Sequence, residues 1–346
     1  KNKKSASVVV MNVNSGEIVG MLSVPNYDPN KLINKPNAEY WKNILENTLA
    51  PLTNRAIQGL YAPGSTFKIV VALAALEKKL INKDTEFYCN GKIEFGDRIF
   101  HCWKTEGHGK VNLIKGIKES CDCYFYEVSN IVGVDNISKM AKKFGFGETT
   151  KIELPNENIG IVPSKKWKKD NLKENWYRGE TLIFGIGQGY ILSTPLQLAK
   201  MTSIIANGGY EVNPTLLTKK DLNTKDKNIG LNSENIKLIR DAMKKVVNEV
   251  YGTAFSSRSN PDNYIFSGKT GTSQVKKITI EERESDDFRK KEIEWKNKDH
   301  ALFVGYMPSE EPKYSISIIV EHGGSGSSTA APIAKEIFNA IHRLRI

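Results

Sequence analysis

Three short motifs in this sequence combine hydroxyl and ammonium side chains in a way that suits nucleophilic chemistry. The first places Ser65 and Lys68 in the stretch Tyr61-Ala62-Pro63-Gly64-Ser65-Thr66-Phe67-Lys68, which runs directly into the apolar residues 69–76. Side chains three apart on a helical turn point to the same face, so the amine can reach the hydroxyl. Serine attacks a carbonyl only when a base takes its proton, and lysine is such a base only where burial or a second cation lowers its pKa. The stretch therefore predicts a serine nucleophile on a buried helix.

The other two motifs lie downstream. They are Ser120-Cys121-Asp122 and Lys269-Thr270-Gly271-Thr272. A serine and a lysine three apart occur by chance in almost any chain of this length, so the first motif is informative only together with the other two. The chain order S-x-x-K, S-x-[ND], K-T-G is the signature of penicillin-binding proteins and serine β-lactamases.

The chain resembles the transpeptidase domain of class B penicillin-binding proteins, most closely the penicillin-binding protein 2 group of the rod-shape elongation machinery. The segments that carry this resemblance span nearly the whole chain: Pro63 to Lys68, His101-Cys102-Trp103-Lys104 with Gly107-His108-Gly109, Ser120-Cys121-Asp122 with Tyr124-Phe125-Tyr126, Gly185-Ile186-Gly187-Gln188-Gly189, and Trp295 to Ala301. The resemblance implies a peptidoglycan D,D-transpeptidase that cross-links stem peptides during cell elongation and is inhibited covalently by β-lactams.

Five catalytic residues follow from the motifs and the resemblance. Ser65 would attack a peptide carbonyl and form an acyl-enzyme, and Lys68 would take its proton. Lys269 would supply the second cation in the same cleft. Ser120 would relay a proton to the leaving amine. Asp122 would hold a substrate amide or a lysine in place.

A strand pattern surrounds the third motif, with Lys269 and Gly271 on one face and Thr270 and Thr272 on the other. By resemblance, this edge strand pairs with the substrate backbone, and its lysine and threonine hydroxyls meet the terminal carboxylate of the stem peptide. The backbone N–H groups of Ser65 and Thr272 would then form the oxyanion hole. Gly271 would permit close approach of the substrate.

Cysteine and histidine spacing indicates a metal site. Cys89, Cys102, His108 and Cys121 are separated by 12, 5 and 12 residues, and tetrahedral zinc commonly takes three thiolates and one imidazole. Penicillin-binding protein 2 enzymes are known for zinc in this region. Disulfides are the competing interpretation, since an extracytoplasmic compartment permits them and four cysteines allow three pairings. We favour structural zinc, with Cys123 as a buried free thiol and no organic cofactor.

Composition bounds the remaining possibilities. The 346 residues, 39% of them hydrophobic, suffice for one large domain or two, and no apolar run reaches the length of a membrane span. The resemblance implies that residues 1–346 are one transpeptidase domain at the periplasmic face of the inner membrane, without its membrane anchor and preceding non-catalytic domain. The net charge of +11 is spread among acids, so we expect no nucleic-acid partner. The implied partners are stem peptides ending in D-Ala-D-Ala, β-lactams, and elongation-complex membrane proteins including a glycosyltransferase.

Local patterns predict an α+β fold. A hairpin is expected at 6–13 and 17–24, an irregular stretch at 27–55, a loop or short-strand excursion at 84–110, and a mobile charged extension at 276–298. Helices are expected at 65–80, from 113 toward Ser120, at 122–132, at 136–144 with Asp135 as cap, at 195–206, at 233–250 and at 331–343. Strands are expected at 265–275, 301–306 and 314–321. This order predicts a mostly antiparallel sheet made from both ends of the chain and covered by helices. It agrees with the fold that the resemblance implies, a five-stranded sheet flanked by helices with an all-helical subregion.

Two other functions use the same three motifs. A β-lactam sensor is acylated and then signals, but no signalling segment is recognisable in this chain. A serine β-lactamase needs a base for rapid deacylation, and residues 152–176 contain no convincing glutamate loop of that kind. We therefore expect the transpeptidase.

Overall fold

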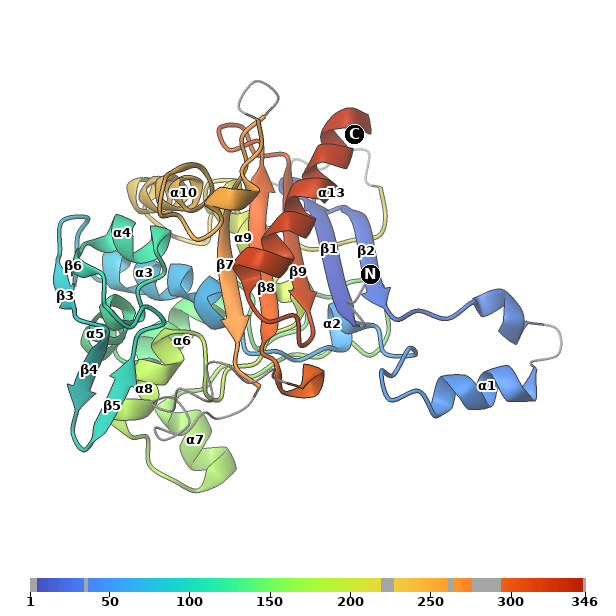
Figure 1. The fold of residues 1–346 in the computed structure, drawn as a ribbon, viewed down its shortest axis with the longest axis horizontal. Helices are drawn as coiled ribbons and strands as arrows, with labels where there is room; N and C mark the ends of the chain where they lie inside the picture. Colours follow the sequence, from blue (N-terminus) through green and yellow to red (C-terminus); the bar gives the residue numbers. More distant parts are fainter. Residues whose placement is uncertain (1–4, 34–36, 219–226, 261–263, 276–293, 345–346) are drawn as a thin grey trace.

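A computed structural model of the chain describes residues 5–33, 37–218, 227–260, 264–275 and 294–344. Its centre is a five-stranded sheet of order β2-β1-β9-β8-β7, in which every neighbouring pair is antiparallel (Figure 1). The strands are β1 Ala6–Asn12, β2 Ile18–Val24, β7 Ser267–Ser273, β8 His300–Met307 and β9 Tyr314–Val320. The two ends of the chain thus build one sheet, as the sequence predicts.

Helices cover both faces of this sheet. α13 (Ala331–Leu344) packs on β8 and β9 on one face, and α9 (Pro195–Ala206) packs on β1, β8 and β9 on the other (Figure 1). α9 begins at a capping box made by Thr194 and Gln197 with Pro195 in its first turn, and all of its residues are buried.

The all-helical subregion lies beside the β7 edge of the sheet (Figure 1). Its centre is α3, whose apolar run from Ile69 to Leu76 is buried on all sides, as expected of a helix that is hydrophobic all round. The helices of the subregion are α3 Lys68–Glu77, α4 Leu113–Lys118, α5 Asp122–Val132, α6 Val134–Lys143, α7 Lys165–Leu172, α8 Arg178–Gly185 and α10 Ser233–Asn248.

The stretch 84–110 forms two small antiparallel sheets, as the excursion of short strands predicts. β3 (Phe87–Cys89) pairs with β6 (Gly109–Val111), and β4 (Lys92–Phe95) pairs with β5 (Arg98–His101). Both sheets lie against the subregion, next to α5 (Figure 1). They bring the segment 101–108 close to the N-terminus of α5.

Two expectations about helices are wrong. The stretch 27–55 contains α1 (Ala38–Leu45) and the short 3-10 turn Pro29–Leu32, and α2 (Arg55–Gln58) begins at its last residue. Asn37 starts α1 by accepting from the backbone N–H groups of Glu39 and Tyr40. Asp135 is not the N-cap, because α6 begins at Val134 and its N-cap is Gly133. The carboxylate of Asp135 instead accepts a hydrogen bond from the backbone N–H of Lys165.

The active-site helix also begins differently from the prediction. Residues Gly64–Phe67 form a 3-10 turn, and the α-helix starts only at Lys68. Further short helical turns in the described part of the chain are Phe255–Ser257, Trp295–Asn297 and the π-helical Gly326–Ala330. Most of the charged extension predicted at 276–298 lies outside the described residues.

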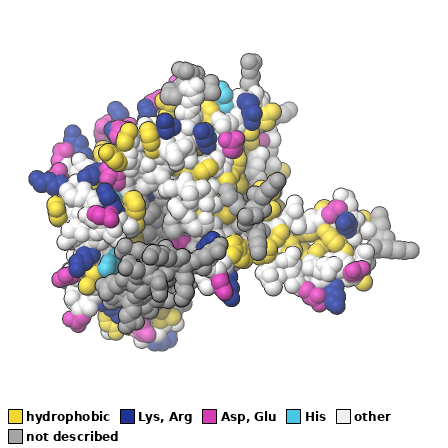
Figure 2. Space-filling model, viewed as in Figure 1, with side chains coloured by type: hydrophobic (Ala, Val, Ile, Leu, Met, Phe, Trp, Pro, Cys, Tyr) yellow, Lys and Arg dark blue, Asp and Glu magenta, His cyan; other side chains and the backbone are white. Residues whose placement is uncertain are grey.

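The segment that carries α1 extends away from the body of the molecule (Figure 1). Apolar side chains are visible along it in Figure 2, and Ile33, Trp41 and Leu45 are exposed. On the face drawn in Figure 2, basic and acidic side chains are intermixed over the body. Among the described residues, no helix combines the length and the hydropathy that a bilayer crossing requires.

Candidate active site and metal centre

The three catalytic motifs meet at one cleft of about 510 Å³ between the sheet edge and the helical subregion. Its lining includes Ser65 from the first motif, Ser120 and Asp122 from the second, and three residues of the third, Thr270, Gly271 and Thr272. Lys68 and Lys269 lie beneath this lining and are completely buried.

Close packing of the backbone places Ser65 against strand β7. The preceding residue, Gly64, has φ +54°, and its N–H donates to the carbonyl of Gly187 at 2.8 Å. A Cβ at Gly64 would lie 2.3 Å from the Thr272 carbonyl oxygen, so only glycine fits between the turn and the strand. Gly271 is required on the strand side, since its Cβ would meet Thr66 Cγ2 at 2.9 Å.

Hydrogen bonds from both buried lysines converge on Ser120. Lys269 Nζ donates to Ser120 Oγ at 2.9 Å, and Lys68 Nζ lies 3.2 Å from the same oxygen. Lys68 Nζ also donates to the Ser120 carbonyl at 2.9 Å and to Asp122 Oδ1 at 2.7 Å. An ammonium has three donors, so these contacts satisfy Lys68 fully.

Charge and burial act against the protonated form of Lys269. Complete burial lowers its pKa well below the usual value of 10.5, and the nearby Lys68 cation lowers it further, while Asp122 opposes the shift. Lys269 Nζ is held by Ser120 Oγ and by the carbonyl of Thr270 at 3.0 Å. Two ammonium groups in one buried site with a single nearby carboxylate favour the loss of a proton.

Three residues near the site were not assigned a role from the sequence. Thr253 Oγ1 lies 2.6 Å from Thr270 Oγ1 and lines the cleft. Gln188 Nε2 donates to the carbonyl of Thr272 at 2.9 Å. Trp103 also lines the cleft. Gln188 and Trp103 lie in segments that carry the family resemblance, whereas no sequence signal singles out Thr253.

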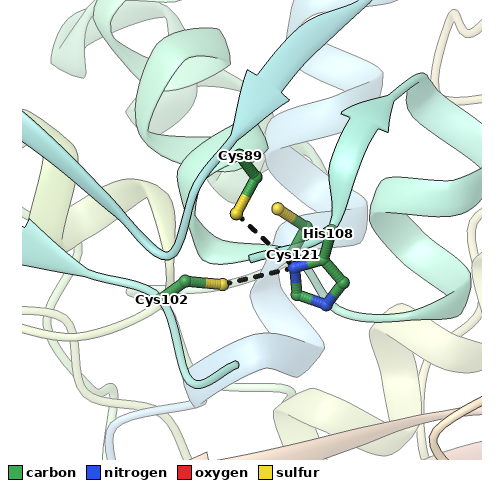
Figure 3. A group of neighbouring side chains, drawn as sticks. All are labelled: Cys89, Cys102, His108 and Cys121. Atoms are coloured by element: carbon green, nitrogen blue, oxygen red, sulfur yellow. Dashed lines mark hydrogen bonds between the residues drawn. The ribbon is translucent and has the colours of Figure 1, made fainter. Parts of the chain in front are cut away.

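The four predicted metal ligands lie together near the N-terminus of α5 (Figure 3). The ligating atoms of Cys89, Cys102, His108 and Cys121 all lie within 4.8 Å of one another, and all four residues are buried. His108 Nδ1 is 3.6 Å from Cys89 Sγ and 3.5 Å from Cys102 Sγ. They come from β3, from the β5–β6 connection and from the residue that precedes α5.

The donor set fits a tetrahedral metal. Zinc bonds of about 2.3 Å to sulfur and about 2.0 Å to nitrogen place S and N ligands about 3.6 Å apart in a tetrahedron. Hydrogen bonds from the Cys121 and Cys123 thiols lower the pKa of Cys102, and the same contacts raise the pKa values of Cys121 and Cys123. Cys102 therefore most favours the thiolate, the form that binds metal. All four cysteines of the chain are free thiols in the structure.

The fold and the three motifs in the cleft are of the penicillin-binding type, and comparison with known proteins agrees. The family model described as "Penicillin binding protein transpeptidase domain" matches residues 6–339. The chain therefore belongs to this family.

Among curated proteins, the chain is similar to peptidoglycan D,D-transpeptidases named MrdA. The chain is 35% identical to the peptidoglycan D,D-transpeptidase MrdA of Haemophilus influenzae over 96% of the chain and 52% of the relative. It is 36% identical to MrdA of Acinetobacter baumannii, over 97% of the chain and 50% of that relative. The chain thus spans about half the length of the curated relatives that it matches.

Solved structures of the same group share the fold. Pseudomonas aeruginosa PBP2 in complex with WCK 5153 superposes with a TM-score of 0.85 and 32% identity, over 97% of this chain and 73% of that one. PBP2 of Helicobacter pylori, solved in a complex with MreC, superposes with a TM-score of 0.88 and 34% identity, over 99% of this chain and 61% of that one. These similarities support a PBP2-type class B penicillin-binding protein.

Proposed function

We propose that this chain is a peptidoglycan D,D-transpeptidase that acts through an acyl-enzyme on Ser65. The observation that carries the proposal is the convergence of Lys68 and Lys269 on Ser120 in the cleft that Ser65 lines. A nucleophile, two amines and a hydroxyl relay at one site suffice for acyl transfer.

The steps follow from these positions. Ser65 Oγ attacks the carbonyl of the D-Ala-D-Ala bond. Lys68 takes the hydroxyl proton after it has passed one of its own protons through Ser120 Oγ to Lys269. The Ser120 hydroxyl, which contacts both lysines, passes a proton to the departing amine of the terminal D-Ala. The amine of a second stem peptide then attacks the ester, gives up a proton by the same route and restores the Ser65 hydroxyl.

Strand β7 is suited to hold the donor peptide. It lies at the edge of the sheet, where an extended peptide can add as a further strand. Thr270 and Thr272 line the cleft beside Ser65, and their hydroxyls bind the terminal carboxylate. The backbone N–H groups of Ser65 and Thr272 stabilise the oxyanion.

Carboxylates near the cleft argue for transpeptidase rather than β-lactamase. Of the described residues, the acids that line it are Asp122, which pairs with Lys68, and Asp299. A glutamate placed to activate water against the acyl-enzyme is absent from this lining. A long-lived acyl-enzyme is therefore expected with β-lactams, a property that a sensor shares.

The names of the relatives support a proposal for the cellular setting. MrdA proteins are peptidoglycan D,D-transpeptidases by name, and PBP2 structures include a complex with MreC and a peptidoglycan synthase complex that couples polymerization and crosslinking. We place this chain at the periplasmic face of the inner membrane, as the transpeptidase domain of an anchored protein. Its partners there are elongation-complex membrane proteins, including a glycosyltransferase.

A structural zinc ion belongs to the same proposal. Cys89, Cys102, His108 and Cys121 would hold it in a closed four-ligand site, which leaves no position for water. The ion would tie β3 and the β5–β6 connection to the N-terminus of α5, where Ser120 and Asp122 lie.

Peptide turnover tests the proposed function. The chain is incubated with a pentapeptide that ends in D-Ala-D-Ala and with a D-amino acid as acceptor, and mass spectrometry follows both products. We expect release of one D-Ala together with a new amide to the acceptor, and neither product with Ser65→Ala. Turnover by Ser65→Ala, or hydrolysis without any transfer to the acceptor, would contradict the proposal.

A further inference from the structure

Trp103 occupies an unusual position at the mouth of the cleft. It follows Cys102 in the β5–β6 connection, and 58% of its surface is exposed although it lines the cleft. Its ring stands edge-on to His108, with the ring centroids 5.5 Å apart. The acyl-transfer steps described above make no use of this side chain.

Both N–H groups of Trp103 donate to residues 119–122, which include the second motif. Its backbone N–H donates to Asp122 Oδ2 at 2.9 Å. Its indole Nε1–H is shared between the carbonyls of Glu119 and Ser120, each at 3.1 Å. An exposed indole could give this hydrogen to water, so two protein acceptors indicate a defined orientation.

Ser120 needs such external support. Its φ of +56° lies in the left-handed region, which a residue other than glycine adopts only when its surroundings hold it there. The Ser120 carbonyl accepts from Lys68 Nζ on one side and from Trp103 Nε1 on the other. The same pair holds Asp122, with Lys68 at Oδ1 and Trp103 at Oδ2.

We propose that Trp103 is a positioning residue for acylation, an inference that rests on the proposed acyl-enzyme function. Through the Ser120 carbonyl and the Asp122 carboxylate, it fixes the two acceptors that orient the Lys68 amine. It does not touch the reacting atoms, so it acts on the rate of the chemical step. Initial binding of a β-lactam or a peptide is independent of the indole N–H.

The variant Trp103→Phe isolates this contribution. Phenylalanine keeps an aromatic ring and the backbone N–H, but it cannot donate to the Ser120 carbonyl. Stopped-flow measurements with a fluorescent β-lactam separate the dissociation constant of the initial complex from the rate constant of acylation. We expect the rate constant to fall about three- to tenfold, as the loss of one neutral hydrogen bond implies, with the dissociation constant unchanged.

Active-site titration keeps the test independent of folding yield, because the rate constant is then expressed per acylable molecule. The matched control is Trp41→Phe on α1, another partly exposed tryptophan outside the cleft, which should leave both constants unchanged. An unchanged acylation rate constant in Trp103→Phe would overturn the inference, as would a change confined to the dissociation constant or to the acylable fraction. If the unmodified chain is not acylated at all, the proposed function itself fails.

Discussion

A carboxylate and two buried ammonium groups surround Ser120, and the balance among them governs the site at the scale of single residues. Lys68 is completely buried, and 13% of the Asp122 side chain is exposed. Asp122 is therefore the charge partner of the proposed base. From the sequence, we expected it to hold substrate or a lysine, and the structure places it on Lys68. Removing Lys68 leaves this carboxylate without its cation.

Lys68→Met should abolish acylation and destabilise the fold together. Loss of a general base costs about 10²–10⁴-fold in rate, and an unpaired, largely buried carboxylate costs up to about 3 kcal/mol. The double variant Lys68→Met, Asp122→Asn should regain most of the stability and none of the acylation. Denaturant unfolding and β-lactam labelling measure the two effects. Lys68→Arg should also fail to acylate, because guanidinium does not deprotonate, so near-normal labelling there would reveal another base.

The lowered pKa of Lys269 predicts how stability depends on pH. Burial holds its folded-state pKa well below 10.5, whereas the unfolded chain keeps about the normal lysine value. Between these two values the unfolded state binds more protons, so Lys269 makes stability rise with pH through that window. Below the folded-state pKa, both states are protonated and the cost of the buried charge is present in full.

Lys269→Met removes this dependence. The stability of the variant relative to the unmodified chain should be greatest near the folded-state pKa of Lys269 and below it. This stability difference should shrink as pH approaches 10.5. Melting temperatures at a series of pH values measure the difference. A difference that is constant with pH, or that grows as pH rises, would contradict the assigned direction of the pKa shift.

At the scale of elements, local signals predict what depends on local sequence. Helix α5 has the predicted bounds of residues 122–132, and α9 has the predicted first helical residue, because caps and proline mark their ends. Helix α1 was not predicted, although its apolar residues Tyr40, Trp41, Ile44 and Leu45 recur at helical spacing. Of these residues the structure buries only Ile44. The pairing of Lys68 with Asp122 joins residues 54 apart in sequence, and no local pattern encodes it.

The cluster of Cys89, Cys102, His108 and Cys121 links several of these elements, so loss of a zinc ion bound there should loosen them together. We expect one zinc per chain, lost in Cys102→Ser, with a lower melting temperature and slower acylation because β3 and the β5–β6 connection no longer anchor the start of α5. Cys123→Ser is the matched control, since Cys123 is a buried thiol outside the four-ligand set. Elemental analysis and thermal unfolding measure the outcome. Absence of zinc from the unmodified chain, or its loss in Cys123→Ser, would refute the ligand set.

For the whole molecule, the order of elements predicted a sheet made from both ends of the chain, and the family resemblance added the all-helical subregion. Strands at both ends of the chain with helices between them indicate one antiparallel sheet, and the structure has both the sheet and the subregion. The three motifs predicted the composition of the cleft, since Ser65, Ser120 and Thr270 all line it. Trp103 and Thr253 were not predicted to act, because their positions depend on how the excursion 84–110 and the segment after α10 pack against the motifs.

The central claim is that Ser65 forms a persistent acyl-enzyme. Mass spectrometry of the intact chain after exposure to a penicillin tests it most directly, followed by peptide mapping and by a time course after removal of free drug. The account predicts the added mass of one β-lactam on Ser65, persistence for minutes to hours, and no adduct on Ser65→Ala. A label on another residue would contradict the nucleophile, and full recovery of free protein within seconds would identify a β-lactamase instead.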